Sequence, residues 1–229
     1  MQPKRIFTLF SHGASAIRFL IEHDKTNYNK RYTIVGSLTD NKDASGISLM
    51  EENGIPCAIE DLRMFADYFG YTGKLKNIPD ELREKYFEHI KPIISIKQPD
   101  LIILSGLLRK IPPSFIGKIP MINVHPADLS IMNPLGGSRK YIGLGNKVVA
   151  QAIEDGQPCL RSTVHVVTSE IDGGEIISLS NPMVIDRIKM SAHDHQELMK
   201  TKCDGPAVKE ALYKICTGLF KFERQLVSS

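Results

Sequence analysis

Asn123 and His125 are the residues of this chain whose types and spacing most directly suggest chemistry. They lie in Met121–Pro126, where a short apolar run meets polar side chains and then a proline. Residues two apart in a strand point to the same face, so the amide and the imidazole would be neighbours. An amide can donate a hydrogen bond to a developing oxyanion, and an imidazole can move a proton. From spacing alone the alternative stays open that Asn123 shapes a turn and His125 caps a neighbouring element.

The elements that must position this pair alternate along the chain between apolar strands and helices. Strands are expected at Ile6–Phe10, Tyr32–Leu38, Ile55–Ile59, Leu101–Leu104 and Met121–Val124, with helices at Ala16–Glu22, Ile47–Glu52 and from Pro79, the last with a core stripe of Leu82, Tyr86, Ile90 and Ile93. Such alternation predicts an α/β fold with a doubly wound, mostly parallel, Rossmann-like sheet. Ligands bind at the carboxyl ends of strands in such sheets. Asn123 and His125, the turn Ser11–Ser15 and the loop Ser105–Arg109 all lie at such ends.

The second half of the chain predicts an antiparallel portion of the sheet and a helical C-terminal region. A strand at Leu160–Thr168, a turn at Ile171–Glu175 and a returning strand at Glu175–Ser180 read as a hairpin. Helices are expected at Asn146–Glu154, at Ala192–Lys200 and from Asp204, the last with an apolar stripe of Val208, Leu212, Ile215 and Leu219. The length of 229 residues fits one large domain.

Two further segments could bind anions. Gly13 and Ser15 lie in a turn of small residues between a strand and a helix, where free N–H groups and the helix dipole attract phosphate. Arg139 and Lys140 lie in the long loop Gly136–Tyr141 and could clamp an acidic ligand. The plainer alternatives are that the turn only connects its neighbours and that the basic side chains are simply solvated.

The composition indicates a cytoplasmic protein that acts on small molecules. Net charge is +3 with the two signs interspersed, which suits small anionic substrates and shows no nucleic-acid footprint. Four cysteines form no Cys-x-x-Cys pair and no zinc spacing, so free thiols and no metal are expected. No apolar stretch approaches the roughly 20 residues that span a bilayer.

Three separated motifs together resemble the formyltransferase family that uses 10-formyltetrahydrofolate. They are Ile122–Pro126, Ser162–Val167 and Ile171–Ile177, in this order. The resemblance implies a catalytic triad of Asn123, His125 and Asp172. Asn123 would donate to the tetrahedral oxyanion, while His125, oriented by Asp172, would donate a second bond and help move the amine proton to folate N10. His165 would support the site, by packing or by function.

The same resemblance assigns the folate and leaves the acceptor open. It implies that backbone groups of two loops hold the pterin, and these groups belong to Leu107, Leu108, Arg109, Lys110, Val167, Thr168 and Ile171. The family member that acts on glycinamide ribonucleotide carries Gly-Ser-Asn in the first turn for the substrate phosphate. This chain has Ala14, Ser15 and Ala16 there, so only Ser15 matches. The donor half of the site therefore follows the family more closely than the acceptor half.

The expected function is formyl transfer from 10-formyltetrahydrofolate to a small phosphorylated amine, glycinamide ribonucleotide first, in purine biosynthesis. A nucleotide-linked amino sugar is the alternative acceptor, and a folate-binding module without turnover is the alternative from another class. The length favours the single-domain type over relatives with an added domain, so residues 1–229 are expected to form one formyltransferase domain. Within it, 1–120 would carry the acceptor-side turn, 121–185 the catalytic and folate-binding half, and 186–229 the C-terminal helices. The protein is expected to be a monomer or homodimer that binds neither nucleic acid nor membrane.

Overall fold

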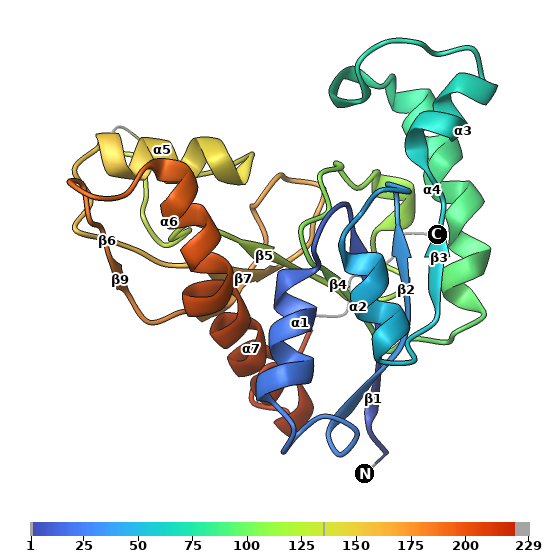
Figure 1. The fold of residues 1–229 in the computed structure, drawn as a ribbon, viewed down its shortest axis with the longest axis horizontal. Helices are drawn as coiled ribbons and strands as arrows, with labels where there is room; N and C mark the ends of the chain where they lie inside the picture. Colours follow the sequence, from blue (N-terminus) through green and yellow to red (C-terminus); the bar gives the residue numbers. More distant parts are fainter. Residues whose placement is uncertain (1, 135, 223–229) are drawn as a thin grey trace. The chain divides into compact units, whose positions relative to one another are not determined.

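The computed structural model (Figure 1) describes residues 2–134 and 136–222. These residues fall into two compact units. The first unit contains the described residues of 1–14 and 27–121, and the second those of 15–26 and 122–222. The helix that follows the first strand therefore belongs to the second unit. None of the helices in the described ranges combines the length and the apolar character that a membrane span needs.

The first unit is built on parallel strands. They are β1 (Lys4–Phe10), β2 (Tyr32–Thr39), β3 (Cys57–Ile59) and β4 (Leu101–Leu104), in the order β3-β2-β1-β4. All four residues of β4 are buried, as expected for a strand that is covered on both faces. The helices of this unit are α2 (Gly46–Glu52), α3 (Leu62–Tyr68) and α4 (Asp80–Ser95), with short 3₁₀ turns at Leu75–Asn77 and Pro113–Phe115.

Helix α3 was not predicted, and it packs beside α4 (Figure 1). Asp61 caps its first turn by accepting a hydrogen bond from the Met64 N–H, and the rings of Phe65 and Tyr86 meet edge to face at 5.3 Å. Seven residues with scattered apolar positions give little periodicity to read, so packing decides this helix. In α4 the predicted stripe is confirmed at three positions but not at Ile93, which is half-buried.

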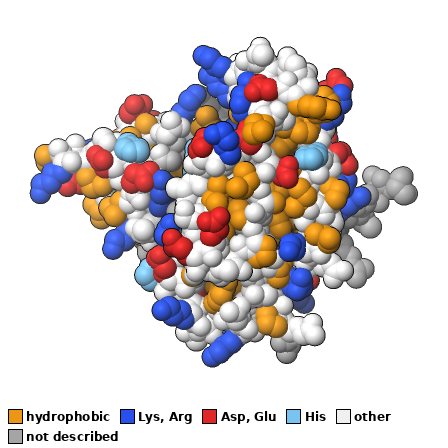
Figure 2. Space-filling model, turned by 45° about the vertical axis from the view of Figure 1, so that its right-hand side comes forward, with side chains coloured by type: hydrophobic (Ala, Val, Ile, Leu, Met, Phe, Trp, Pro, Cys, Tyr) orange, Lys and Arg blue, Asp and Glu red, His pale blue; other side chains and the backbone are white. Residues whose placement is uncertain are grey.

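Some apolar side chains of the first unit remain exposed. They include Ile59 at the end of β3 and Met64, Tyr68 and Phe69 in and after α3. Figure 2 shows hydrophobic side chains gathered on the face that it turns toward the viewer. Exposed apolar residues are common on folded proteins, and these do not form part of the site described below.

The second unit is built on antiparallel strands. β5 (Met121–His125), β7 (Thr163–Val166) and β8 (Ile176–Leu179) follow in that order, while β6 (Cys159–Leu160) pairs separately with β9 (Met183–Val184). The predicted strand Leu160–Thr168 is therefore wrong as one element. It divides because Ser162 bonds to the Ser180 and Asp204 side chains, which interrupts the ladder between β6 and β7.

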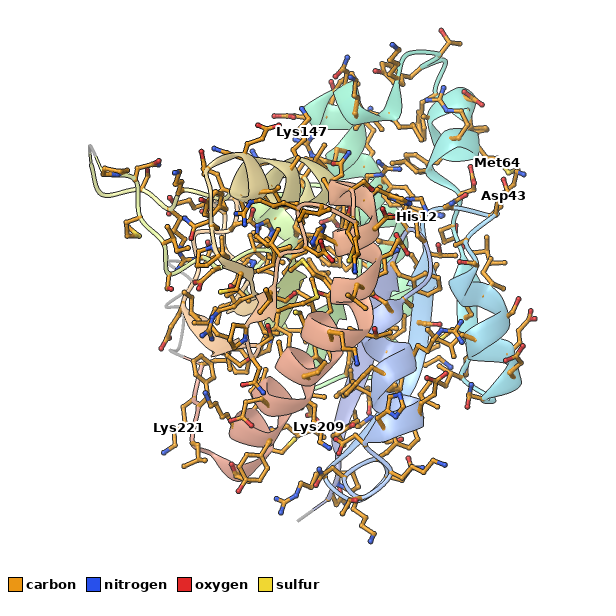
Figure 3. All side chains as sticks on the ribbon, turned by 60° about the vertical axis from the view of Figure 1, so that its left-hand side comes forward. His12, Asp43, Met64, Lys147, Lys209 and Lys221 are labelled. Carbon is orange, nitrogen blue, oxygen red and sulfur yellow. The ribbon has the colours of Figure 1, made fainter. Side chains whose placement is uncertain are left out.

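Helices α1 (Ser15–His23), α5 (Gly145–Glu154), α6 (Ala192–Met199) and α7 (Gly205–Thr217) complete this unit, with a π-helical turn at Lys200–Asp204. Helices α1 and α7 lie side by side (Figure 1) because Gly205 allows close approach: a Cβ there would lie 2.1 Å from the Phe19 ring. Lys209 of α7, which is labelled in Figure 3, also lies 3.4 Å from the Asp24 carboxylate just after α1.

Two outcomes follow for the expected fold. The predicted fold class is confirmed, with parallel pairing in the first unit, antiparallel pairing in the second and a helical C-terminal region. The predicted helical position of Leu219 is wrong, because Gly218 adopts a left-handed conformation (φ 77°) that ends α7, and Leu219 is 73% exposed.

Candidate active site

The register of two antiparallel strands places three polar side chains on one face. Asn123 of β5 lies opposite His165 of β7, and His125 lies opposite Thr163. Asn123 Nδ2 is 3.2 Å from His165 Nε2, and the two imidazole rings are 6.5 Å apart between centroids. The amide and the imidazole predicted from the spacing of two are thus neighbours, and His165 joins them.

The carboxylate of Asp172 lies between the two imidazoles. Its Oδ2 is 3.6 Å from His125 Nδ1, its Oδ1 is 3.4 Å from His165 Nε2, and Oδ2 accepts a hydrogen bond of 2.8 Å from the Gly143 N–H. The side chains of both histidines are 3% exposed and that of Asp172 is 8% exposed. Water is therefore largely excluded from this group, which strengthens its electrostatic interactions.

Burial sets the protonation of His125. Burial lowers the pKa of His125, and the charge of Asp172 together with the hydrogen bond to the Tyr141 carbonyl offsets only part of that effect. The neutral ring donates from Nε2 to the Tyr141 oxygen at 2.8 Å. This carbonyl is well anchored, because the Tyr141 ring is buried in an apolar cluster with Val148, Val149 and other residues. His125 is therefore a neutral base at physiological pH.

The charge of Asp172 is maintained against its burial. Desolvation by itself would raise the pKa of this carboxyl, but its contacts with His165, with His125 and with the Gly143 N–H together lower it. Asp172 is thus ionised at neutral pH. It can stabilise a positive charge that develops on either imidazole.

His165 links Asp172 to the amide of Asn123. Its Nδ1 lies 2.9 Å from the Val166 carbonyl, to which it donates. In a neutral ring Nε2 then accepts from the Asn123 amide. The same amide carries a second N–H, which is the group that could donate to a substrate oxygen.

The turn that carries Asp172 has a tightly specified backbone. Asp172 has a φ of 53°, in the left-handed region. Gly174 must be glycine, because a Cβ there would lie 1.9 Å from the Val166 oxygen. Arg139 donates to the carbonyl oxygens of Asp172 and Gly174, the latter at 2.8 Å. The sequence predicted Arg139 as a ligand for an acidic group, whereas the structure places its guanidinium on this turn.

The other predicted basic residue is paired within the protein. Lys140 Nζ lies 2.9 Å from Asp155 Oδ2 and 5.4 Å from the centre of the Tyr141 ring. Its ammonium is therefore occupied by Asp155 in this structure.

The residues expected to hold the pterin occur in two loops. After β4, the Leu108 N–H donates to Ser11 Oγ at 3.0 Å and Arg109 Nε donates to the buried Asp40 at 2.6 Å, while Lys110 is exposed and Leu107 half-buried. After β7, the predicted residues are the buried Val167, the half-buried Thr168 and the exposed Ile171, and Thr168 Oγ1 donates to the Glu170 carbonyl. The first loop is thus bonded to Ser11 and Asp40, and the second contains a side-chain-to-backbone bond of its own.

The expected phosphate turn reaches the start of a helix. Ser15 is the first residue of α1, Ala14 has a φ of 48°, and Gly13 is half-buried. The N–H groups in the first turn of a helix have no preceding carbonyl of that helix to bond to, which is the feature that favours an anion at this place.

The sequence did not indicate the backbone groups that complete the cluster. The Tyr141 carbonyl and the Gly143 N–H contact His125 and Asp172, yet every residue has such groups, so no residue type marks them. The ladder position of His165 opposite Asn123 could have been found from the register of a predicted hairpin. No cluster of three or more His, Cys, Asp or Glu side chains suited to a metal occurs among the described residues.

Comparisons with known proteins agree on one family. The family model described as formyl transferase matches residues 4–202. The phosphoribosylglycinamide formyltransferase of Escherichia coli (strain K12) is 28% identical over 174 residues, which are 75% of this chain and 69% of that protein. The protein of the same name from Mycobacterium tuberculosis is 24% identical over 186 residues, 80% of this chain and 73% of that protein.

Solved structures share the fold over nearly the whole chain. Glycinamide ribonucleotide transformylase 1 from Symbiobacterium toebii has a TM-score of 0.74 at 19% identity. The match covers 96% of this chain and 91% of that protein's chain. The phosphoribosylglycinamide formyltransferase of Coxiella burnetii has a TM-score of 0.72 at 21% identity, with 97% and 91% covered. A formyltetrahydrofolate deformylase from Pseudomonas syringae also has a TM-score of 0.72, at 17% identity, with 97% of this chain and 64% of that chain covered.

Proposed function

This chain belongs to the formyl transferase family, and we propose on that basis that it transfers a formyl group from 10-formyltetrahydrofolate to the primary amine of glycinamide ribonucleotide, a step of purine biosynthesis. One observation carries the proposal: the Asp172 carboxylate lies between two buried imidazoles, beside the Asn123 amide. A protein that only bound folate would not need this cluster. The cluster has the hydrogen-bond donor, the general base and the negative charge that acyl transfer requires.

In the proposed reaction the acceptor amine attacks the formyl carbon and a tetrahedral oxyanion forms. Asn123 donates its second N–H to that oxygen, and His165 fixes the orientation of the amide. His125 exchanges its Tyr141 contact for the substrate with its proton on Nδ1, which faces Asp172. Its free Nε2 then takes the proton of the attacking amine and passes it to folate N10 as the C–N bond to the folate breaks. Asp172 stabilises the imidazolium that forms in between.

We assign the remaining contacts within the same proposal. Backbone groups of Leu107–Lys110 and of residues 167–171 hold the pterin, and the turn at Gly13 and Ser15 holds the acceptor phosphate. The protein acts in the cytoplasm on small molecules, as a single domain over residues 1–229 and as a monomer or homodimer. No metal takes part in the transfer.

A nucleotide-linked amino sugar is the second candidate acceptor. It is favoured by Ala14 and Ala16, which stand where the glycinamide ribonucleotide enzyme has Gly and Asn for its phosphate. Arg139 and Lys140 would also favour this acceptor if their cationic groups were free to bind it. In the structure Arg139 bonds to the 172–174 turn and Lys140 pairs with Asp155, which weakens that argument. Glycinamide ribonucleotide therefore remains the first candidate.

The proposal is tested by measuring tetrahydrofolate release from the purified protein with 10-formyltetrahydrofolate and a panel of amines. We expect turnover with glycinamide ribonucleotide above every nucleotide-linked amino sugar. Asn123→Ala should lower kcat by about 10²–10³, because removing one oxyanion donor typically costs that much. Asn146→Ala, an exposed asparagine on α5, is the matched control and should keep wild-type turnover. Wild-type release no faster than that of Asn123→Ala would overturn the proposal.

A further inference from the structure

Arg139 makes an unusual contact for a basic residue beside an active site, because it bonds to backbone and not to a carboxylate. Its two terminal nitrogens donate separately to the carbonyl oxygens of Asp172 and Gly174. A guanidinium presents its donors in a rigid planar fork, so one side chain can fix two acceptors at a set spacing. The acceptors here are the two ends of the turn that carries the Asp172 carboxylate.

This turn has a backbone conformation that needs support. Asp172 has a φ of 53°, which an L-residue seldom adopts, and Gly174 crosses Val166 so closely that no side chain fits. Within the turn, the Gly173 N–H bonds to the Glu170 carbonyl at 3.2 Å. In the described part of the chain, the Gly143 N–H holds the Asp172 carboxylate, and the hydrogen bonds to the Asp172 and Gly174 carbonyls come from Arg139.

Arg139 is itself held in place by the loop that carries it. The Lys140 N–H donates to the Ile131 carbonyl at 2.9 Å, and Met132 forms an antiparallel bridge with Arg139. The Asn133 amide also donates to the Arg139 carbonyl at 3.3 Å. The two segments that pair at the base of this loop thus fix the backbone from which the guanidinium reaches the turn.

We propose that Arg139 is a positioning residue, whose guanidinium holds the 172–174 turn so that the Asp172 carboxylate faces both His125 and His165. Arg139 then has no role as a ligand of the acceptor, which revises the expectation from its sequence position. The effect on turnover rests on the proposed function, whereas the effect on the turn does not.

A charge effect accompanies the positional one. Burial is the main reason that the pKa of His125 is lowered, and the Arg139 guanidinium acts in the same direction. Arg139→Lys keeps a positive charge but loses the planar fork, so it separates geometry from charge. Arg139→Gln retains at most one good donor to the two carbonyls and serves as the second variant.

The first measurement is independent of activity and follows amide hydrogen exchange at Gly173 in the full chain. We expect exchange to accelerate by about tenfold or more in Arg139→Lys and Arg139→Gln, because opening of the turn no longer breaks two charge-assisted bonds. Arg187→Lys is the matched control, since Arg187 is exposed and also donates to a backbone carbonyl, that of Gln157. Unchanged exchange at Gly173 in both Arg139 variants would overturn the inference.

The second measurement is the split between kcat and KM in formyl transfer. A displaced Asp172 should lower kcat by about 10- to 100-fold in Arg139→Lys, with KM for either substrate changed by no more than about twofold. A raised acceptor KM with unchanged kcat and unchanged exchange would instead make Arg139 a substrate ligand. If the wild type transfers no formyl group to any amine, the proposed function fails while the exchange measurement still decides this inference.

Discussion

At the scale of single residues, burial and neighbouring groups give His125 and Asp172 different charges: the imidazole is neutral and the carboxylate is ionised. Burial lowers the pKa of His125 because the low-polarity surroundings disfavour an imidazolium. The pKa of Asp172 is lowered despite its burial, because donors and a neighbouring imidazole stabilise the carboxylate. The site thus holds a neutral base next to a fixed negative charge, the combination that general base catalysis needs near neutral pH.

The lowered pKa of His125 predicts a loss of stability in acid. An unfolded histidine titrates near 6.5, so below that pH the unfolded chain binds a proton that the folded chain resists. Stability is therefore intact above about 6.5 and falls as pH decreases toward the folded pKa. The lowered pKa of Asp172 acts only below about 3.9, outside this window.

We expect the wild type to lose more unfolding free energy than His125→Gln between pH 7.5 and 5.5. One proton over one pH unit corresponds to about 1.4 kcal/mol, which bounds the difference between the two proteins. Glutamine can still donate to the Tyr141 carbonyl, so the comparison isolates the titration. Urea unfolding at both pH values measures it, and parallel losses in the two proteins would contradict the prediction.

At the scale of elements, the link between α6 and α7 contains a buried acid. Asp204 ends the π-helical turn Lys200–Asp204, and its Oδ1 accepts a hydrogen bond of 2.5 Å from Ser162 Oγ. Burial raises the pKa of this carboxyl to about 6. The same contact to Ser162 contributes to the break between β6 and β7, so one acid affects both a helix junction and a sheet.

Asp204→Asn should stabilise the protein at pH 7.5. A folded pKa raised above the unfolded value of about 3.9 means that the folded state prefers the protonated form. Its contribution is therefore present at low pH and is lost as pH rises through about 6. Asparagine stays neutral and still accepts from Ser162, so its melting temperature should exceed that of the wild type at pH 7.5, by a margin that narrows as pH falls toward about 3.9. Asp67→Asn, at an exposed site on α3, is the control. A variant less stable than the wild type at pH 7.5 would refute the assignment.

At the scale of the whole molecule, stability rests on apolar strands that are covered on both faces. β4 contributes Leu101, Ile102, Ile103 and Leu104, each at most 5% exposed. Close-packed interiors relax only partly when a side chain is shortened, so a cavity adds to the lost burial.

Ile103→Ala should lower the free energy of unfolding by about 2–5 kcal/mol, since Ile103 is 0% exposed. Ile188 is 95% exposed, so Ile188→Ala should change it by no more than about 0.5 kcal/mol. Urea unfolding followed by circular dichroism compares both variants with the wild type. Equal effects of the two substitutions would contradict the burial of β4.

Local patterns predicted the elements well wherever one pattern ran without interruption. Leu101–Leu104 has the same bounds in the prediction and in the structure, because four consecutive apolar residues suit only a buried strand at this length. The prediction failed at Leu160–Thr168, where the polar Ser162 engages side chains from distant parts of the chain. Short α3 was missed because its residues show little periodicity.

In the candidate site, too, some features could be predicted from local sequence and others could not. Asn123 and His125 share a face because alternation along a strand is a local property, and Asp172 was found through its family motif. The bond from His125 to the Tyr141 carbonyl and the donation of Gly143 to Asp172 could not be read from residue types. Backbone groups are present at every position, so only the folded path of the chain selects which of them reach the site.

The sequence by itself determined the fold class, the family resemblance and the pairing of Asn123 with His125, because these depend on periodicity and on motifs along the chain. Only the tertiary structure decided that Asp172 lies between two imidazoles, that burial keeps His125 neutral and that Arg139 bonds to the 172–174 turn. Burial and long-range hydrogen bonds arise when distant segments meet. For Arg139 the residue type predicted a positive charge, and the fold determined that it is directed at two backbone carbonyls.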